Sequence, residues 1–281
     1  MGRILVRVTA ELRARHDPLA HLRRLGIDEI SHRKGQRYLT VVVDHDSGLL
    51  VWAHPGRDRK TLRRFFDLLG DERCARIELV SADGADWIAE VVAERCPHAS
   101  LCLDPFHIVQ WATDALDEVR REVWNIARRA GQTAEAKQLK GARFCLWKNP
   151  EDLSGRQQAT LAQIADTNEP LYRAYLLKEQ LRTLLKLPAD QALALLERWL
   201  AWARRCRLAP FITLAQKIRA HWRGIAAALT HGLSNARTES VNTRIRLIAR
   251  RAFGFHSPQA LIALALLSLG GLCPPLPGRT G

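Results

Sequence analysis

The sequence predicts an α/β fold: a mixed five-stranded sheet with flanking helices, interrupted by an all-helical block before the last two helices. Two observations lead to this prediction. Up to residue 104, β-branched runs alternate with amphipathic segments in the order strand, strand, strand, helix, strand, helix, strand. After residue 106 the pattern is helical to about residue 231. Strands that alternate with helices after a meander form a mixed sheet with helices on its faces.

The predicted strands are short apolar runs bounded by turn residues. They cover residues 25–30, 38–43, 49–53, 77–80 and 99–103. The turn Asp46-Ser47-Gly48 joins the second and third strands into a hairpin. Helices are expected at 58–69 and 86–94, the first because its apolar residues recur at three- to four-residue spacing.

The later part of the chain is divided into helices by prolines, which favour helix boundaries. A long helix is expected at 108–129, and two further helices, 236–251 and 258–269, follow the helical block. The prolines expected at helix boundaries are Pro150, Pro170, Pro188 and Pro210.

Composition points to a nucleic-acid partner. The 281 residues have a formal net charge of +14 and a pI near 10.2, and lysines and arginines that neutralise phosphates release counterions. Charge alone leaves open a general basic background or ribosomal association. The apolar run 260–269 is too short to cross a bilayer, and the N-terminus lacks a secretory signal. We therefore expect a cytoplasmic protein without membrane contact.

The cysteines and tryptophans are expected to be structural. Six cysteines occur without a CxxC pair, a pattern typical of reduced, buried thiols. Six tryptophans in the helical block could stack on bases, but packing between helices is the more common role. They are Trp111, Trp124, Trp147, Trp199, Trp202 and Trp222.

Two aspartates mark the ends of neighbouring predicted strands. Asp28 lies within the first strand, and Asp83 directly follows the apolar run IELVSA. Each alone is open to interpretation as a turn or cap residue, with Asp83 capping the next helix. Together they form a pair of carboxylates that would repel one another without a cation, and carboxylate oxygens suit magnesium.

A second acidic motif follows the fifth strand. Asp104 and His107 form a DxxH pattern at the start of a helix. Asp104 before Pro105 also fits an ordinary N-terminal cap. A zinc site formed by Cys102, Asp104 and His107 is the less favoured alternative, because this spacing matches no known ligand pattern.

The helix predicted at 236–251 carries a third acid. Glu239 lies in its first turns, and Asn235 and Asn242 are about one turn away on the same face. Arginines next to a carboxylate site can position phosphates, although they also suit a solvated face. They are Arg237, Arg244, Arg246, Arg250 and Arg251.

Four segments in this order resemble the catalytic region of the ISL3 family of insertion-sequence transposases. They are GIDE at 26–29, VSAD at 80–83, LDPFH at 103–107 and SNARTESVNTRIRLIARRAFGF at 234–255. The resemblance extends over residues 25–269. It implies a ribonuclease-H-like fold and a DDE-type transposase that cleaves DNA and transfers strands with divalent metal.

The resemblance also implies roles for individual residues. The metal-binding catalytic triad carries over to Asp28, Asp83 and Glu239, and Asp104 and His107 take supporting roles. The implied cofactor is Mg²⁺ or Mn²⁺, as two ions. The implied partners are the terminal repeats of the element and target DNA, bound by a homo-oligomer at the nucleoid.

Members of this family usually begin with a zinc-binding segment and a helix-turn-helix, whereas this chain starts about two dozen residues before Asp28. We therefore expect either a truncated copy or an upstream reading frame. The expected division is a helical remnant at 1–24, a catalytic core at 25–107 and 232–270, a helical insertion at 108–231 and a flexible tail at 271–281. Two other functions remain open: a nuclease without strand transfer, and an inactive DNA-binding remnant that interferes with a full-length transposase.

Overall fold

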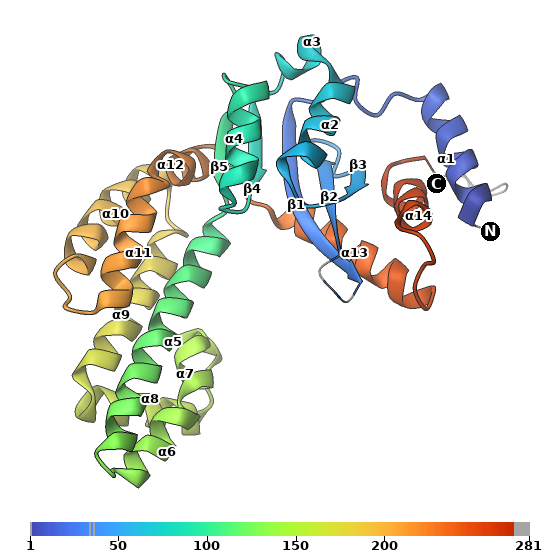
Figure 1. Ribbon diagram of the computed structural model, residues 1–281. Helices are drawn as coiled ribbons and strands as arrows, with labels where there is room; N and C mark the ends of the chain where they lie inside the picture. Colours follow the sequence, from blue (N-terminus) through green and yellow to red (C-terminus); the bar gives the residue numbers. More distant parts are fainter. Residues whose placement is uncertain (1, 34, 36, 273–281) are drawn as a thin grey trace. The chain divides into compact units, whose positions relative to one another are not determined.

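The computed structural model describes residues 2–33, 35 and 37–272 (Figure 1). The chain forms two compact units. The first, here called the sheet unit, consists of Met1–Asp104 together with Leu233–Gly281. The second, the helical unit, is Pro105–Gly232. Most of the predicted tail, including Cys273, lies outside the described residues.

The sheet unit contains the predicted mixed sheet of five strands, in the order β3-β2-β1-β4-β5. Strands β1, β2 and β3 pair antiparallel, whereas β4 pairs parallel with both β1 and β5. Their bounds are β1 Arg24–Arg33, β2 Arg37–Asp44, β3 Leu50–Pro55, β4 Leu79–Ala82 and β5 Ser100–Leu103. This arrangement confirms the predicted ribonuclease-H-like α/β fold.

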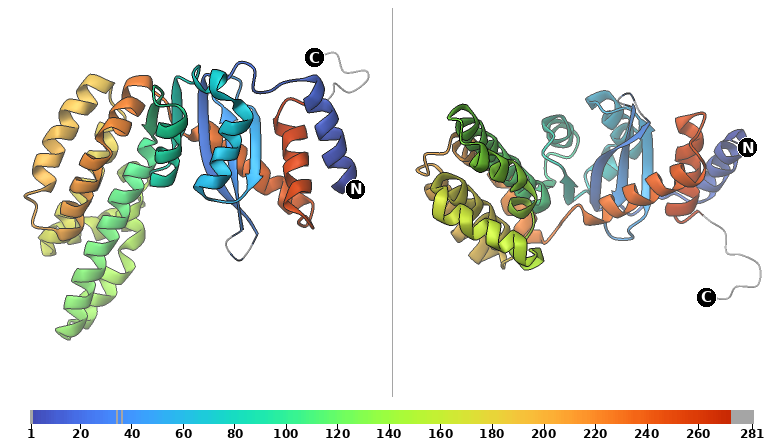
Figure 2. Two further views of the ribbon diagram at one scale, coloured as in Figure 1. Left: turned by 45° about the horizontal axis from the view of Figure 1, so that its top comes forward. Right: turned by 90° about the horizontal axis from the view of Figure 1, so that it is seen from below.

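Helices cover both faces of the sheet (Figures 1 and 2). On one face, α2 (Arg59–Leu69) and α4 (Asp86–Arg95) pack against alternate residues of β1, including Leu25 and Ile27. On the other face, α13 (Ala236–Arg251) and α14 (Pro258–Leu269) pack against Ile30 and the odd-numbered residues of β2. Since side chains alternate along a strand, β1 is apolar toward both helical layers.

The ends of these helices follow from local sequence. Asp58 caps α2 by accepting a hydrogen bond from the Thr61 backbone N–H at 2.7 Å. Ser257 caps α14 through the Ala260 N–H, and Pro258 occupies its first turn. Helices α13 and α14 have the bounds predicted from the sequence. Two further helices belong to this unit: α1 (Gly2–Arg15), which contacts α14 through Thr9, and the short α3 (Asp71–Cys74).

The helical unit begins with α5 (Pro105–Arg129), three residues earlier than predicted because Pro105 fits the first turn of a helix. The four prolines predicted at helix boundaries all lie at the N-terminal ends of helical segments. The remaining elements are α6 Thr133–Gly141, α7 Arg143–Trp147, η1 Pro150–Asp152, α8 Gly155–Thr167, α9 Glu169–Leu184, α10 Ala189–Ala203, α11 Ala209–Ala220 and α12 Trp222–His231.

The tryptophans of the helical unit differ in their burial. Trp199 is fully buried, and its indole N–H donates to the Leu177 carbonyl at 2.9 Å, as expected for a packing anchor. The other five are half-buried, and four of these have a cation over the ring: Trp111, Trp124, Trp147 and Trp222. Packing between helices is therefore shown for Trp199 and for Trp111, whose ring on α5 contacts Lys217 and His221 of α11 and its C-terminal cap.

The cysteines within the described residues are free and buried, as predicted. Burial raises the pKa of the Cys96 thiol to about 12 and that of Cys102 to about 11. Because a thiolate is the reactive form, these thiols are inert at neutral pH.

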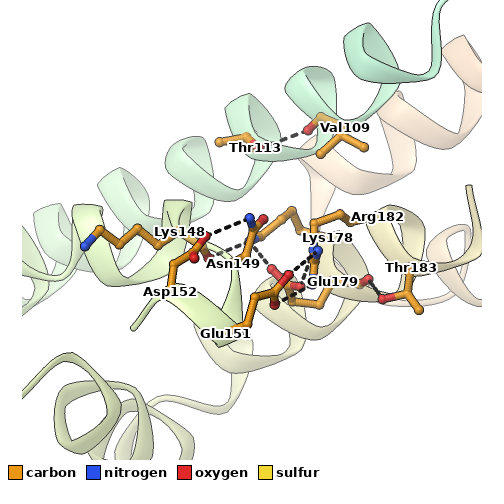
Figure 3. Close-up of polar contacts among 10 residues, drawn as sticks. All are labelled: Val109, Thr113, Lys148, Asn149, Glu151, Asp152, Lys178, Glu179, Arg182 and Thr183. Atoms are coloured by element: carbon orange, nitrogen blue, oxygen red, sulfur yellow. Dashed lines mark hydrogen bonds and ion pairs between the residues drawn. The ribbon is translucent and has the colours of Figure 1, made fainter. Parts of the chain in front are cut away.

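A buried ionic network fixes α9 to the segment before α8 (Figure 3). Lys178 is 1% exposed and forms an ion pair with Glu179. Arg182 donates to Glu179 at 2.8 Å and to both carboxylate oxygens of Glu151, at 3.0 and 3.2 Å. Burial lowers the pKa of Lys178, while Glu179 favours its charged form. The ion pairs offset the cost of burying these charges.

We predict that Lys178→Ala destabilises the protein by about 3 kcal/mol, because it leaves Glu179 buried with only part of its ionic partnership. Urea denaturation followed by circular dichroism measures the change. Lys137→Ala is the matched control, since Lys137 is exposed on α6. Equal midpoints for the two variants would show that the network does not contribute to stability.

Candidate active site

Asp28 lies on the face of β1 that is covered by α13. Its Oδ2 accepts a hydrogen bond from the Asn242 side-chain amide at 2.7 Å, and its Oδ1 accepts from the Glu29 backbone N–H at 2.7 Å. Strand β1 pairs with β4 only from Arg24 to Gly26. The half-buried Asp28 carboxylate therefore lies just beyond the carboxyl end of β4, where open α/β sheets place their ligand sites.

Asp83 is the first residue after β4, which ends at Ala82. The strand lies two residues later than predicted, so that Asp83 comes directly to the sheet edge. The alternative interpretation of Asp83 as a helix cap is wrong, because Ala85 occupies the N-cap position of α4. Asp83 instead accepts from the Ala85 N–H at 3.3 Å within its own turn.

Glu29, the neighbour of Asp28 on β1, is a carboxyl influenced by Asp83 as well as by Asp28. Burial raises the pKa of this carboxyl to about 7; Arg57 opposes this rise, and the negative charges of Asp83 and Asp28 add to it. Glu29 has only 6% of its side chain exposed and forms an ion pair with Arg57. Two carboxylates close enough to affect a third one create a strongly negative edge, which attracts a cation.

Glu239 extends from the first turn of α13 and is half-buried. A carboxylate oxygen of Glu239 and one of Asp104 lie within 4.8 Å of one another. Within the part of the chain that the structure describes, Asp28, Asp83 and Glu239 do not form a group whose ligand atoms all lie within that distance. The three residues come from β1, the end of β4 and the helix that packs on β1.

Asp104 and His107 lie on either side of the boundary between the units. Asp104 is 3% exposed and ends the first segment of the sheet unit, where its Oδ2 accepts from the Asn235 backbone N–H at 3.0 Å. His107 belongs to the helical unit, in the first turn of α5. Among the described residues, the group of possible metal ligands that contains Asp104 does not include Cys102, which disfavours the zinc alternative.

Two asparagines predicted beside Glu239 attach α13 to the sheet. Asn242 holds Asp28, while the Asn235 side-chain oxygen accepts from the Ser81 hydroxyl at 2.9 Å. Ser81 is in turn 2.7 Å from Nε2 of His45. All of these side chains except Asp28 are buried. Such a network is stabilising where its members are hydrogen-bonded.

Gly26 allows α13 to approach the sheet. A Cβ at this position would lie 2.1 Å from Oγ1 of Thr238 and 2.9 Å from Nε2 of His45, so only glycine fits without displacing the helix. The sequence alone did not indicate the packing role of Gly26 and Thr238 or the hydrogen bonding of His45 and Ser81. The serine in the otherwise apolar strand IELVSA was the available signal for Ser81.

The arginines predicted to bind DNA are exposed along α13. Arg237 differs from the rest, because it donates to the backbone carbonyls of His45 and Asp46 and so also anchors the helix. Arg246 and Arg250 line a cavity beside β1. Their role in DNA binding stays a prediction.

Comparison with known proteins decides the family. The sequence model of the DDE transposase family ISL3, described as "Transposase", matches residues 25–265. This chain belongs to the ISL3 family of DDE transposases. Membership confirms the family predicted from the four motifs and makes the chain a DDE-type transposase, an enzyme that acts on DNA.

Two curated ISL3-like relatives show the extent of the similarity. The transposase for insertion sequence element IS1557 of Mycobacterium tuberculosis is 56% identical over 99% of this chain and 67% of its own length. The transposase for insertion sequence element IS1001 of Bordetella parapertussis is 31% identical over 89% of this chain and 62% of its own length. In this transposase, no helix of the described residues is both long and apolar enough to cross a bilayer.

We predict that Gly26→Ala destabilises the transposase by about 1–3 kcal/mol, because the new methyl group displaces Thr238 and α13 with it. Thr238→Ala in the same chain removes the nearest clashing atom and is expected to restore part of the loss. Denaturation midpoints measure both effects. Gly155→Ala serves as the control, since nothing lies near its would-be Cβ; an effect of equal size there would contradict the steric explanation.

We also predict a pH dependence from His45. Burial, followed by the charge of Arg237, lowers the pKa of this imidazole from 6.5 to about 4. Because the unfolded state binds the proton more readily, His45 contributes stability above pH 6.5 that is lost as pH falls toward 4, by about 3 kcal/mol. Denaturation across this range should show a flatter profile for His45→Gln. An unchanged slope would mean that other groups cause the acid sensitivity.

Proposed function

We propose that Asp28, Asp83 and Glu239 form the metal site at which this transposase cleaves DNA and transfers strands. The observation that supports this most directly is the Asn242–Asp28 hydrogen bond, because it joins the helix that carries Glu239 to the strand that carries the first aspartate. The shared influence of Asp28 and Asp83 on Glu29 supports the inclusion of Asp83.

The residues fit a hard divalent cation. The donors are carboxylate oxygens, which suit Mg²⁺ or Mn²⁺ better than zinc. Three carboxylates, from β1, from the end of β4 and from α13, would supply charged oxygen ligands for divalent ions.

The chain's own residues prepare this site. Asn242 orients Asp28, and Asn235 links α13 both to Asp104 and to Ser81. Asp104, with its oxygen near Glu239, is a supporting acid, and we assign His107 the same supporting role. When bound, the divalent metal would activate water, then a freed 3′-hydroxyl, and stabilise charge on the attacking and leaving oxygens. No covalent protein intermediate is required.

The proposed partners are the terminal repeats of an insertion sequence and a target DNA. The net charge of +14 supports attraction to phosphates. The exposed arginines of α13 extend from the site and are placed to hold the backbone of the bound strand. We further propose that the protein acts as a homo-oligomer on DNA at the nucleoid, so that two element ends are processed together.

We predict that Asp28→Asn, Asp83→Asn and Glu239→Gln each reduce cleavage of supercoiled plasmid in Mg²⁺ or Mn²⁺ by at least about 100-fold, because each removes a charged metal ligand. Gel analysis of nicked and joined products measures the loss. Asp166→Asn, an exposed carboxylate on α8, is the matched control.

The products distinguish the alternatives. Joined strands indicate a transposase, whereas nicks alone indicate a nuclease without strand transfer. DNA binding without cleavage by the unmutated chain would favour the inactive remnant. Cleavage by a triad variant at the rate of the unmutated chain would remove that residue from the site.

A further inference from the structure

A cavity of the sheet unit is lined by the end of β1, the start of β2 and the connection from α13 to α14. Its volume is about 570 Å³, within the range of about 300–1,000 Å³ typical of small-ligand sites. It is lined on one side by His32, Arg37 and Tyr38 and on the other by Phe253 and His256. The proposed catalytic residues do not line it.

The cavity is strongly basic. Arg33, Arg37 and Arg57 line it, and a neighbouring cavity of about 200 Å³ adds Arg246 and Arg250. The two cavities share His32, Ala249 and Leu261. No aspartate or glutamate lines either cavity among residues 2–33, 35 and 37–272. Clustered guanidinium groups without acidic partners in the wall favour an anionic, phosphate-bearing ligand.

Phe253 has an unusual conformation at the mouth of this cavity. Its side chain is fully exposed, and its backbone φ is +53°, in the left-handed region that disfavours bulky residues. The positive φ belongs to the C-terminal cap of α13, where the Phe253 and Gly254 backbone N–H groups donate to the carbonyls of Arg250 and Ala249. The full exposure of the ring, in contrast, gives up apolar burial. An exposed aromatic ring beside arginines is the combination that stacks on an unpaired base while its phosphate is held.

The cavity is within reach of the proposed metal site. His32 lies four residues beyond Asp28 on β1, which corresponds to about 13 Å at about 3.3 Å per residue. This span equals about four nucleotide steps of B-form DNA at about 3.4 Å per step. Arg57 also connects the two places, since it lines the cavity and pairs with Glu29 beside Asp28 and Asp83.

We propose that this cavity binds an unpaired nucleotide of the DNA strand a few steps from the scissile phosphate. The base stacks on Phe253, and Arg33 and Arg37 hold its phosphates. The proposal rests on the proposed function, because it takes the DNA substrate from there. It adds a single-strand requirement: a nucleotide must leave the duplex before it can enter a cavity of this size.

The test is binding of a twelve-nucleotide single strand that carries one 2-aminopurine, measured by its fluorescence in EDTA. Stacking contributes about 1–3 kcal/mol per base, so Phe253→Ala should weaken binding by about 5- to 150-fold and abolish the quenching of 2-aminopurine. Phe253→Trp should retain both signals. Arg37→Ala should reduce the slope of log affinity against log salt by about 0.7, the value for one phosphate contact on a single strand.

Two controls make the result specific. Phe144→Ala removes another exposed phenylalanine, on α7, and should leave binding unchanged. A fully paired duplex of the same sequence should bind the unmutated chain and Phe253→Ala equally. Phe253→Gly should raise the melting temperature by about 2–4 °C by relieving the positive φ, while losing single-strand binding. A higher melting temperature together with weaker binding would show that the loss of binding does not result from unfolding.

Several outcomes would overturn the proposal. These are unchanged single-strand affinity of Phe253→Ala, an equal loss on single strand and duplex, or a change in sedimentation with unchanged DNA binding, which would assign Phe253 to a protein interface. Because the assay contains no divalent metal, it measures binding at the cavity without cleavage at the triad. Failure of the triad assignment and failure of the cavity proposal are therefore separate results.

Discussion

The close approach of α13 to β1 is the constraint on which the candidate site depends. Gly26 leaves room for Thr238, and Asn242 then reaches the Asp28 carboxylate at 2.7 Å. A helix held a few ångströms farther out would lose the hydrogen bond from Asn242 to Asp28. Apolar packing thus holds α13 against the sheet, and the polar contacts fix its position along β1.

Contacts around this helix also determine which charged side chains have partners. Burial lowers the pKa of His45 and favours its neutral form. Because the Ser81 hydroxyl donates its one hydrogen to Asn235, Nε2–H of His45 donates to Ser81. The Asp104 carboxylate accepts from the Asn235 backbone N–H. Glu29, on the opposite face of β1 from Asp28, forms an ion pair with Arg57, and its pKa is raised by burial and by the charges of Asp83 and Asp28. Arg57 thus compensates the charge of Glu29, and the Asn235 N–H compensates part of the charge of Asp104.

The strands and the last two helices could be predicted from the sequence because their signals are local. Alternating and β-branched runs marked the sheet, and Pro258 marked the start of α14. The polar network could not be predicted, because its partners are far apart in the chain: Ser81 and Asn235 are separated by 154 positions and Asp28 and Asn242 by 214. The sequence supplied the acids and asparagines, and only the tertiary fold pairs them. The position of Phe253 likewise depends on its positive φ, which was not predicted from the sequence.

The hydrogen bond between Asp104 and Asn235 has a topological consequence. The helical unit leaves the sheet unit after Asp104 and returns at Leu233, and 3.0 Å separates the Asp104 carboxylate from the Asn235 nitrogen two residues further on. For a flexible connection, the entropy of closing such a gap rises only by about 0.6 kcal/mol for each doubling of segment length. By this relation a whole unit between these two points costs only about 3 kcal/mol more than a turn of about four residues. A unit with its own core can offset that cost, so the helical unit is a replaceable module on the sheet unit.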